Sequence, residues 1–233
     1  MRLQPLGDSA LILDFADESS DADELLRRAL TVAEVLERAQ IPGVIEITSA
    51  YQSVALFLDL SSVTAAAADR QIEDFLNDRI ASALAAAGRA TKRRVRSVDI
   101  PVCYDGEFAL DLARVAEQVT LNPSEVIALH LSAKYTTACI GFMPGFPFLA
   151  GLPKQLHLPR LATPRTHVPA GSVAIAGAQS GIYPLESPGG WNVIGRTPIQ
   201  LFDPKANPPA LLRAGDQVRF RAITRDEFNA LLR

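Results

Sequence analysis

Hydrophobic and polar positions follow two different periods in the first hundred residues. Three mostly apolar segments are short enough to be strands: residues 8–15, 44–48 and 53–58. In residues 23–39 apolar side chains recur every three or four positions, which predicts a helix that Ile41-Pro42-Gly43 ends. An alanine-rich segment predicts a second helix over residues 64–87, ended by Gly88.

The order of these elements predicts a ferredoxin-like α/β domain. With residues 95–102 as a fourth strand, the order is strand, helix, strand, strand, helix, strand, the plan in which two helices cover one face of an antiparallel sheet. Near residue 100 the pattern changes from alternating helices and strands to short strands with many turns, so we predict two domains, 1–92 and 93–233. Residues 95–102 therefore stand at the junction of the two predicted domains.

Beyond residue 101 turns become frequent and helices few. Asn122 can cap a helix that has Pro123 at its first position, and Glu125 can complete a capping box, so a helix is predicted to about residue 133. Short apolar segments between Gly and Pro residues predict the strands 135–142, 172–176, 191–194, 199–202 and 217–223. A short helix should start at Thr224. This pattern favours a β-barrel or β-sandwich for residues 101–233.

Residues 163–198 contain the densest run of turn-forming residues and the only Trp of the chain. Repeated Pro and Gly force the backbone to turn and let it approach a ligand closely, as expected of a binding surface. We therefore expect the functional site within this segment.

Composition and charge narrow the class of protein. The chain has 233 residues, of which 48% are hydrophobic and 21% charged. No segment approaches the ~18 apolar residues needed to span a bilayer and the N-terminus lacks a secretory signal pattern, so we expect a cytoplasmic protein without a membrane partner. Cys103 and Cys139 are not spaced as metal ligands with the three His, and we expect both to be buried.

Charge is distributed unevenly along the chain. Residues 1–90 carry 7 basic and 15 acidic side chains, whereas residues 91–233 carry 16 and 11, which predicts two domains of opposite sign. Only the segment TKRRVR (91–96) clusters basic charge, and no aromatic residues are interleaved with it. A nucleic-acid partner is therefore not expected, and a small anionic substrate or an acidic partner surface fits better.

Several longer motifs carry a family resemblance. The segments GDSALILDF, YDGEFALDLARVA, SEVIALH, GFMPGFPFLAGLP, TPRTHVPAGSVAIAG, GIYPLESPGGWNVIGRTP and AGDQVRF, in this order, resemble the family of the 5-oxoprolinase B subunit, also called allophanate hydrolase subunit 1 or kinase A inhibitor. The resemblance covers nearly the whole chain. It implies an α+β fold with a ferredoxin-like α/β domain followed by a cyclophilin-like β-barrel domain.

The resemblance implies the B subunit of an ATP-dependent 5-oxoprolinase, which opens the lactam of 5-oxo-L-proline to L-glutamate together with partner subunits A and C. The sequence has no P-loop, no Gly-x-Ser-x-Gly elbow, no Ser/Lys pair and no metal motif. ATP would therefore bind at an unconventional site, a shared site or another subunit, and this chain alone should not hydrolyse the lactam. Two alternatives are an inhibitor of a sensor histidine kinase and the carboxyltransferase-like part of an allophanate- or urea-metabolising enzyme.

Polar residues of the segment 163–198 are the candidates for substrate binding and catalysis. Arg165 and Arg196 could clamp a carboxylate or phosphate, or could instead form ion pairs. Glu186 could be a base or the partner of one of these arginines. Candidates for hydrogen bonds to an amide or a developing oxyanion are Gln179, Tyr183, Ser187, Gly189 and Gly190. His130, near the end of its predicted helix, could be an acid or base or could complement the helix dipole.

The proline-rich segment 141–153 should form a rigid aromatic loop in which prolines limit strand pairing. We predict that the C subunit docks on a surface made by Pro144, Phe146, Phe148 and Trp191, because exposed aromatics are unfavourable unless a partner covers them. Alternatively, these rings close the end of the barrel and Trp191 belongs to its core.

Overall fold

The computed structural model describes residues 2–87 and 95–232 and divides the chain into two compact units, Met1–Arg94 and Val95–Arg233. The predicted helix stop at Gly88 and most of the basic segment 91–96 lie outside the described residues. Across the described ranges, no helix combines the length and the apolar character needed to cross a membrane.

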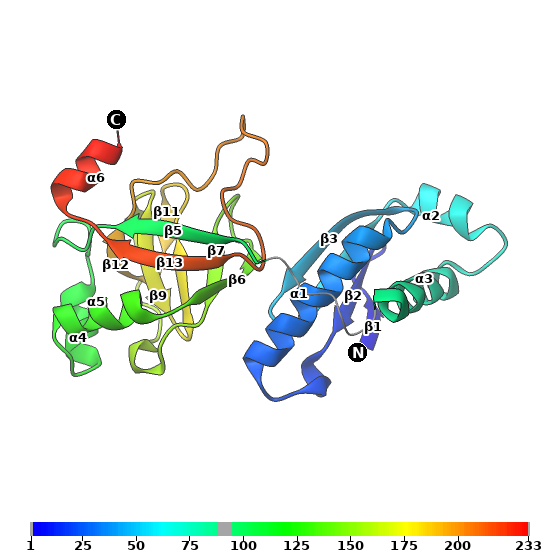
Figure 1. The fold of residues 1–233 in the computed structure, drawn as a ribbon, viewed down its shortest axis with the longest axis horizontal. Coiled ribbons are helices and arrows are strands. Elements are labelled where there is room, and N and C mark those ends of the chain that lie inside the picture. Colours follow the sequence, from blue (N-terminus) through cyan, green and yellow to red (C-terminus); the bar gives the residue numbers. More distant parts are fainter. Residues whose placement is uncertain (1, 88–94, 233) are drawn as a thin grey trace. The chain divides into compact units, whose positions relative to one another are not determined.

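The first unit is an antiparallel four-stranded sheet with helices packed against it. Its sheet has the order β1-β2-β4-β3. The strands are β1 (Arg2–Pro5), β2 (Ala10–Asp14), β3 (Val44–Ala50) and β4 (Ser53–Leu58), and the helices are α1 (Ala22–Ala39), α2 (Leu60–Ala67) and α3 (Ile72–Ala87). Helix α1 lies across β3 and β4 and beside α3 (Figure 1). Its apolar face meets Leu13, Val54 and Leu56 of the sheet in one buried core.

Local sequence explains where α1 begins. The Asp21 side chain accepts hydrogen bonds from the backbone N–H groups of Asp23 and Glu24, which satisfies donors that have no partner inside the helix. The carboxylates of Asp23 and Glu24 also complement the helix dipole. The acidic run before this helix is therefore part of a helix start.

Two sequence predictions are wrong in this unit. The single helix expected over residues 64–87 is two helices, because Ala68 has a left-handed φ of 53° that breaks the helical path. The expected fourth strand, residues 95–102, instead forms β5 (Ser97–Val102) in the other unit, where it pairs in parallel with β13 (Gln217–Ala222). The outer place beside β2 is filled by β1, which the sequence pattern does not predict.

The second unit is built on a seven-stranded sheet that closes almost completely. The strand order is β12-β9-β10-β7-β6-β13-β5. The two outer strands meet where Cys103, just after β5, and Arg196 of β12 exchange backbone hydrogen bonds of 2.8 and 2.9 Å. The result is a barrel-like sheet (Figure 1), and apolar side chains fill its interior. The chain is thus a mixed α+β protein, as predicted.

The remaining elements of this unit surround the barrel-like sheet. Its other strands are β6 (Tyr135–Ile140), β7 (Pro147–Ala150), β9 (Ser172–Ala176), β10 (Gln179–Ile182) and β12 (Asn192–Arg196), and a two-stranded sheet pairs β8 (Arg165–Val168) with β11 (Ser187–Gly189). The helices are α4 (Leu112–Gln118), α5 (Pro123–Ser132) and α6 (Arg225–Leu231). Helix α5 has the predicted capping box between Asn122 and Glu125, and Thr224 caps α6.

The strand predictions fail at two places in this unit. Residues 199–202 do not form a strand and make only a single bridge between Phe202 and Ala210. The segment 141–153, predicted to pair poorly, contains β7, which pairs with both β6 and β10. Pro147 is the first residue of β7, where a missing N–H is tolerated, so the strand can continue to Ala150.

Candidate functional site

Aromatic rings from three segments form a buried cluster on one side of the barrel-like sheet. Phe146 lies edge-on to Tyr183 and Trp191, with ring centroids 5.2 and 5.7 Å apart. Phe146 and Trp191 are only 1% and 5% exposed. Gly181 makes room for this packing, because a Cβ there would lie 2.8 Å from the Phe146 ring. These rings form a small core of their own, distinct from the one inside the barrel-like sheet, so two of the four residues predicted for docking, Phe146 and Trp191, are buried.

Phe142 is the exposed aromatic side chain of the segment 141–153. It is 66% exposed and has a left-handed φ of 67°, which is uncommon for a residue with a side chain. Its ring packs edge-on against the buried Phe146 and Tyr183, at 5.5 and 6.5 Å between centroids. Pro144 is also exposed, and Phe148 is half-buried. The sequence places Phe142 in the loop but does not single it out, because its backbone angle is not visible in the residue pattern.

Arg165 is held in a two-pronged ion pair. Its two terminal nitrogens donate to the two carboxylate oxygens of Asp111 at 2.8 and 2.7 Å. The Asp111 side chain is 3% exposed and also accepts the Val193 backbone N–H at 2.7 Å. Asp111 precedes helix α4 but makes no side-chain cap for it, because its oxygens are used by Arg165 and Val193. Arg165 therefore follows the ion-pair alternative, with a partner that was not expected from the sequence.

The same carboxylate belongs to a wider polar network. Arg114 of α4 lies 3.7 Å from Asp111 and donates to the Asn192 side-chain oxygen. The Asn192 amide group donates to the carbonyls of Pro159 and Ile175, both at 3.0 Å. This network joins α4 to strands β8, β9 and β12, so its main effect is to fix the frame of the segment 163–198. Among the described residues the buried Arg114 Nε has no hydrogen-bond partner, but the Asp111 carboxylate and the Asn192 amide are paired, and such paired buried groups are costly to disturb.

The other two charged candidates, Arg196 and Glu186, make contacts outside the Asp111 network. The Arg196 Nε donates to the Ala170 carbonyl at 2.7 Å, so this guanidinium is tied to the backbone. Glu186 pairs with His167 at 3.1 Å, and both side chains are mostly exposed. The predicted pairing of Glu186 with an arginine is therefore replaced by one with His167.

The Gly189-Gly190 turn brings several predicted residues together. Gly189 pairs with Arg165 across the β8–β11 sheet, and a Cβ on Gly189 would overlap the Tyr183 hydroxyl. Burial raises the pKa of the Tyr183 phenol, whereas the Trp191 backbone N–H and the positive charges of Arg160 and Arg165 act in the opposite direction. The charges of two arginines thus act on the Tyr183 hydroxyl at this turn.

Other predicted contacts at this site are less informative. The Ser187 hydroxyl bonds its neighbour Pro188 at the carbonyl, 3.2 Å away. Gln179 is half-buried at the start of β10. Arg160, which no sequence pattern marks, is the residue added to the site by the structure.

His130 lies in the barrel core and away from solvent. Ser180 donates its hydroxyl to the Ala174 carbonyl at 3.3 Å, so the hydroxyl oxygen can accept the His130 Nε2–H, also at 3.3 Å. This leaves Nδ1 to accept the Tyr104 hydroxyl at 2.8 Å. Burial lowers the pKa of His130 from 6.5 to about 3, so the ring is neutral at physiological pH. Its position is that of a hydrogen-bonded core residue.

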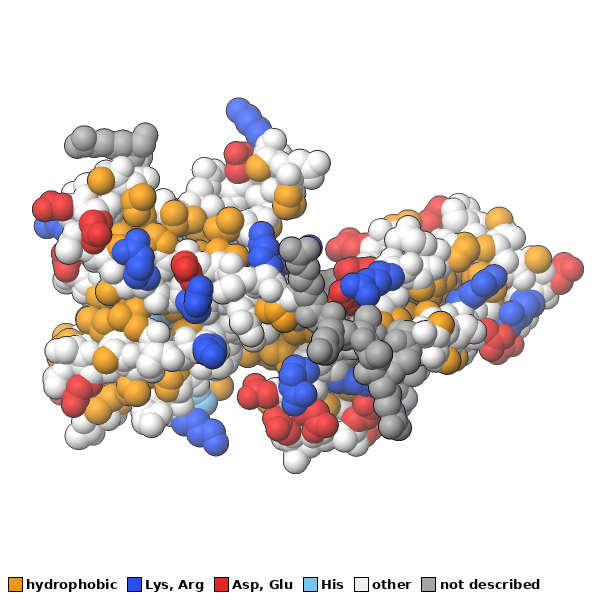
Figure 2. Space-filling model, viewed as in Figure 1, with side chains coloured by type: hydrophobic (Ala, Val, Ile, Leu, Met, Phe, Trp, Pro, Cys, Tyr) orange, Lys and Arg blue, Asp and Glu red, His pale blue; other side chains and the backbone are white. Residues whose placement is uncertain are grey.

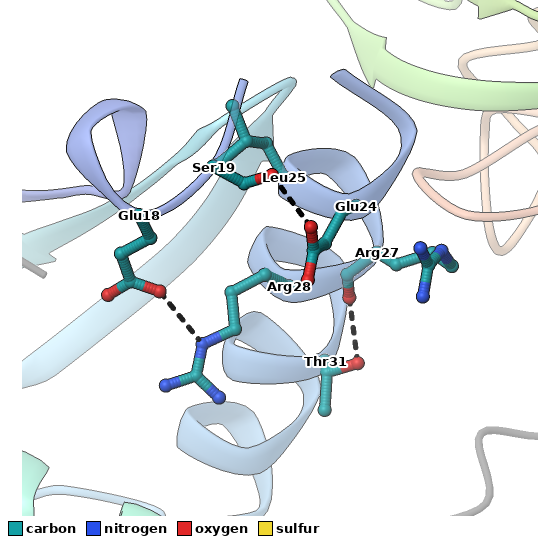
Figure 3. Close-up of a pocket in the computed structure, with 7 residues that line it drawn as sticks. All are labelled: Glu18, Ser19, Glu24, Leu25, Arg27, Arg28 and Thr31. Carbon is teal, nitrogen blue, oxygen red and sulfur yellow. Dashed lines mark hydrogen bonds and ion pairs between the residues drawn. The ribbon is translucent and has the colours of Figure 1, made fainter. Parts of the chain in front are cut away.

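A hollow of about 270 Å³ lies on α1 of the first unit (Figure 3). Its polar groups satisfy one another: Glu18 pairs with Arg28 at 3.5 Å, and Ser19 bonds Glu24 at 2.6 Å. None of the predicted site residues lines it. We therefore do not assign the functional site to this hollow.

Two surface and side-chain features bear on metal and nucleic-acid binding. No group of three or more His, Cys, Asp and Glu that could hold a metal occurs in residues 2–87 and 95–232. On the face of the second unit seen in Figure 2, basic side chains are scattered singly. That face lacks the continuous basic stripe that nucleic-acid-binding surfaces present.

Comparison with known proteins gives a consistent assignment. A family model described as carboxyltransferase domain, subdomain C and D, matches residues 1–212. The chain is 40% identical to the 5-oxoprolinase B subunit of Bacillus subtilis (strain 168), over 98% of this chain and 95% of that protein. It is 38% identical to the 5-oxoprolinase B subunit of Escherichia coli O157:H7, over 92% and 93% of the two chains.

A solved structure has a similar fold. The crystal structure of TTHA0988 matches with a TM-score of 0.75 and 40% sequence identity over 92% of this chain. The chain spans only 40% of that longer protein. Sequence identity and fold agree, and the chain therefore belongs to the carboxyltransferase subdomain C and D family, among the relatives named as the B subunit of 5-oxoprolinase.

Proposed function

We propose that this chain works as the B subunit of an ATP-dependent 5-oxoprolinase and, with subunits A and C, opens the lactam of 5-oxo-L-proline to L-glutamate. The observation that carries the proposal is the 40% identity, over nearly the full length of both chains, to a protein named as the B subunit of 5-oxoprolinase. The kinase-inhibitor and carboxyltransferase-like alternatives stay predictions. In fold, we assign the first unit as ferredoxin-like and the second as cyclophilin-like.

The chemistry of the reaction accounts for a complex of several subunits. A lactam carbonyl resists attack by water, and coupling to ATP hydrolysis would activate its oxygen. The chain has no P-loop, and its buried polar groups serve the frame of the segment 163–198. We therefore assign this chain a role in holding substrate or partner and place the nucleotide on a partner or at a shared site.

The surface proposed for the C subunit centres on Phe142. Its ring is largely exposed but rests on buried rings, so little side-chain freedom is lost when a partner covers it. Pro144 is exposed on the same loop, and Leu185, two residues after Tyr183, is 46% exposed. Exposed apolar side chains of this kind are typical of a protein interface core.

The test is reconstitution with the A and C subunits encoded by the same genome. The three proteins together should hydrolyse ATP in a manner that depends on 5-oxo-L-proline, and leaving out any one of them should abolish this activity. The isolated chain should show no such hydrolysis. Full activity of a mixture that lacks this chain, or substantial turnover by the chain alone, would show that the proposal is wrong.

A further inference from the structure

Two arginines are placed around the Gly189-Gly190 turn by backbone contacts. The Leu161 N–H donates to the Gly190 carbonyl at 2.7 Å, which holds the segment beginning at Arg160 against the turn. A Cβ on Gly190 would lie 3.9 Å from the Arg160 Cβ. On the other side, Arg165 is the cross-strand partner of Gly189. The positions of both arginines therefore follow from the backbone and not only from flexible side chains.

The two guanidinium groups differ in what they contact. Arg165 uses both terminal nitrogens on Asp111, and its side chain is only 28% exposed. Arg160 is exposed and makes no hydrogen bond or ion pair with another residue in the described ranges. The nearby carboxylate of Glu186 pairs with His167. The positive charge of Arg160 is thus left uncompensated beside a second, fixed arginine.

An uncompensated guanidinium next to a fixed one is a suitable arrangement for a small oxyanion. Guanidinium groups bind carboxylates and phosphates through paired, charge-assisted hydrogen bonds. Only Gly190 leaves space at the turn, since a Cβ there would meet its nearest groups at ordinary contact distances of 3.6 to 3.9 Å, whereas the space beside Gly189 is filled by the Tyr183 hydroxyl. Burial raises the pKa of the Tyr183 hydroxyl, and the charges of Arg160 and Arg165 act in the opposite direction.

We propose that Arg160 is an anion-binding residue, which holds the carboxylate of 5-oxo-L-proline or a phosphoryl group at the Gly189-Gly190 turn. Arg165, whose guanidinium is paired with Asp111, frames the other side of the turn. The identity of the ligand rests on the function proposed above, whereas the anion site itself does not. Arg196 is not part of this site, because its Nε is tied to the Ala170 carbonyl.

Arg160 is also the right residue to change. Replacing Arg165 would leave Asp111 buried without its partner, so any loss of binding could come from unfolding. Arg160 has no such partner, and Arg160→Gln should leave the fold intact by circular dichroism. Arg219→Gln is the matched control, because Arg219 is an exposed arginine on β13, a strand that does not pair with β8 or β11.

The experiment titrates the full chain with 5-oxo-L-proline, with inorganic phosphate and with uncharged 2-pyrrolidinone. Binding of each compound is measured by calorimetry or NMR. The wild type and Arg219→Gln should bind one of the two anions, and Arg160→Gln should bind it about 10- to 100-fold more weakly, the range typical of a lost charge-assisted hydrogen bond. Binding of 2-pyrrolidinone should be far weaker. The anion that binds distinguishes a carboxylate site from a phosphoryl site.

Two results would overturn the inference: equal anion affinity of the wild type and Arg160→Gln, or no binding of either anion by the wild type. These results are separate from the reconstitution test. A complex without oxoprolinase activity, together with phosphate binding that depends on Arg160, would retain the anion site and reject the proposed function. An active complex, together with equal anion affinity of the wild type and Arg160→Gln, would retain the proposed function and reject the anion site.

Discussion

Phe142 and Phe146 lie four residues apart on one loop, and their rings touch, yet one is 66% exposed and the other 1%. The loop between them turns at Gly145, where a Cβ would lie 2.7 Å from that of Phe202. Beyond this turn Phe146 joins the buried core with Tyr183 and Trp191, whereas Phe142 stays outside it. The comparison teaches that an aromatic loop can supply structure and interface at once, with backbone geometry deciding which ring does which.

The charged residues of the second unit also fall into a buried group and an exposed group. Asp111 and Arg165 form a largely buried pair that fixes three strands and a helix, whereas Arg160 and Glu186 lie exposed at the rim. The second unit therefore has a buried frame and an exposed rim. Changes to the frame should cost stability, and changes to the rim should cost binding.

The largest effect on stability is expected for Phe146→Ala. Removing a fully buried aromatic ring should lower the free energy of unfolding by about 3–5 kcal/mol, because transfer energy is lost and a cavity remains. Phe142→Ala should lower it by less than about 1 kcal/mol, since its ring is mostly exposed. Denaturant unfolding of both variants measures this difference, and equal losses would remove the distinction between the two rings.

A loss of about 3 kcal/mol is expected for Asp111→Ala. The change leaves Arg165 and Arg114 without their carboxylate and the Val193 N–H without its acceptor. Asp99→Ala is the control, because Asp99 is 62% exposed and pairs with the equally exposed Arg219, an ion pair worth at most about 1 kcal/mol. Thermal and denaturant unfolding should separate the two variants clearly. If both lose the same small amount, the buried network does not hold the frame.

The last effect on stability appears only at acid pH and acts through His130. Its pKa is about 3 in the folded protein and near 6.5 when unfolded, so the unfolded state binds more protons between these values. Stability from this group is complete above pH 6.5 and falls as the pH is lowered towards 3, by at most about 1.4 kcal/mol per pH unit. His130→Gln can keep both hydrogen bonds but does not titrate. It should show a shallower loss of stability in this window, and identical pH profiles would contradict the buried, neutral assignment.

The sequence predicts much of this fold because local signals agree with the final structure. The capping box at Asn122 and the apolar segment 172–176 appear as α5 and β9 where they were expected. The break at Ala68 was missed because an alanine-rich segment gives no hint of a left-handed residue. The strand 95–102 was predicted correctly as a strand, but its partner β13 lies more than a hundred residues away, and periodicity says nothing about pairing.

The site was harder to predict than the fold. Turn chemistry and polar side chains point to Arg165, Tyr183 and the Gly189-Gly190 turn, and the structure brings these together. The same pattern could not show that Asp111 neutralises Arg165, because the pair joins positions 54 residues apart. Arg160 lies just before the selected segment and had no distinguishing pattern. Whether an arginine has a carboxylate partner depends on tertiary contacts, which the local sequence pattern does not contain.

The most direct measurement of the partner surface is co-elution of the C subunit with the variant Phe142→Asp. A charge on an exposed ring position should leave the barrel folded, with a circular dichroism spectrum like that of the wild type, while it prevents a partner from covering the loop. We predict that Phe142→Asp melts within a few degrees of the wild type and no longer co-elutes with the C subunit. A folded Phe142→Asp chain that still co-elutes in wild-type proportion would contradict the assignment of Phe142 to the partner surface.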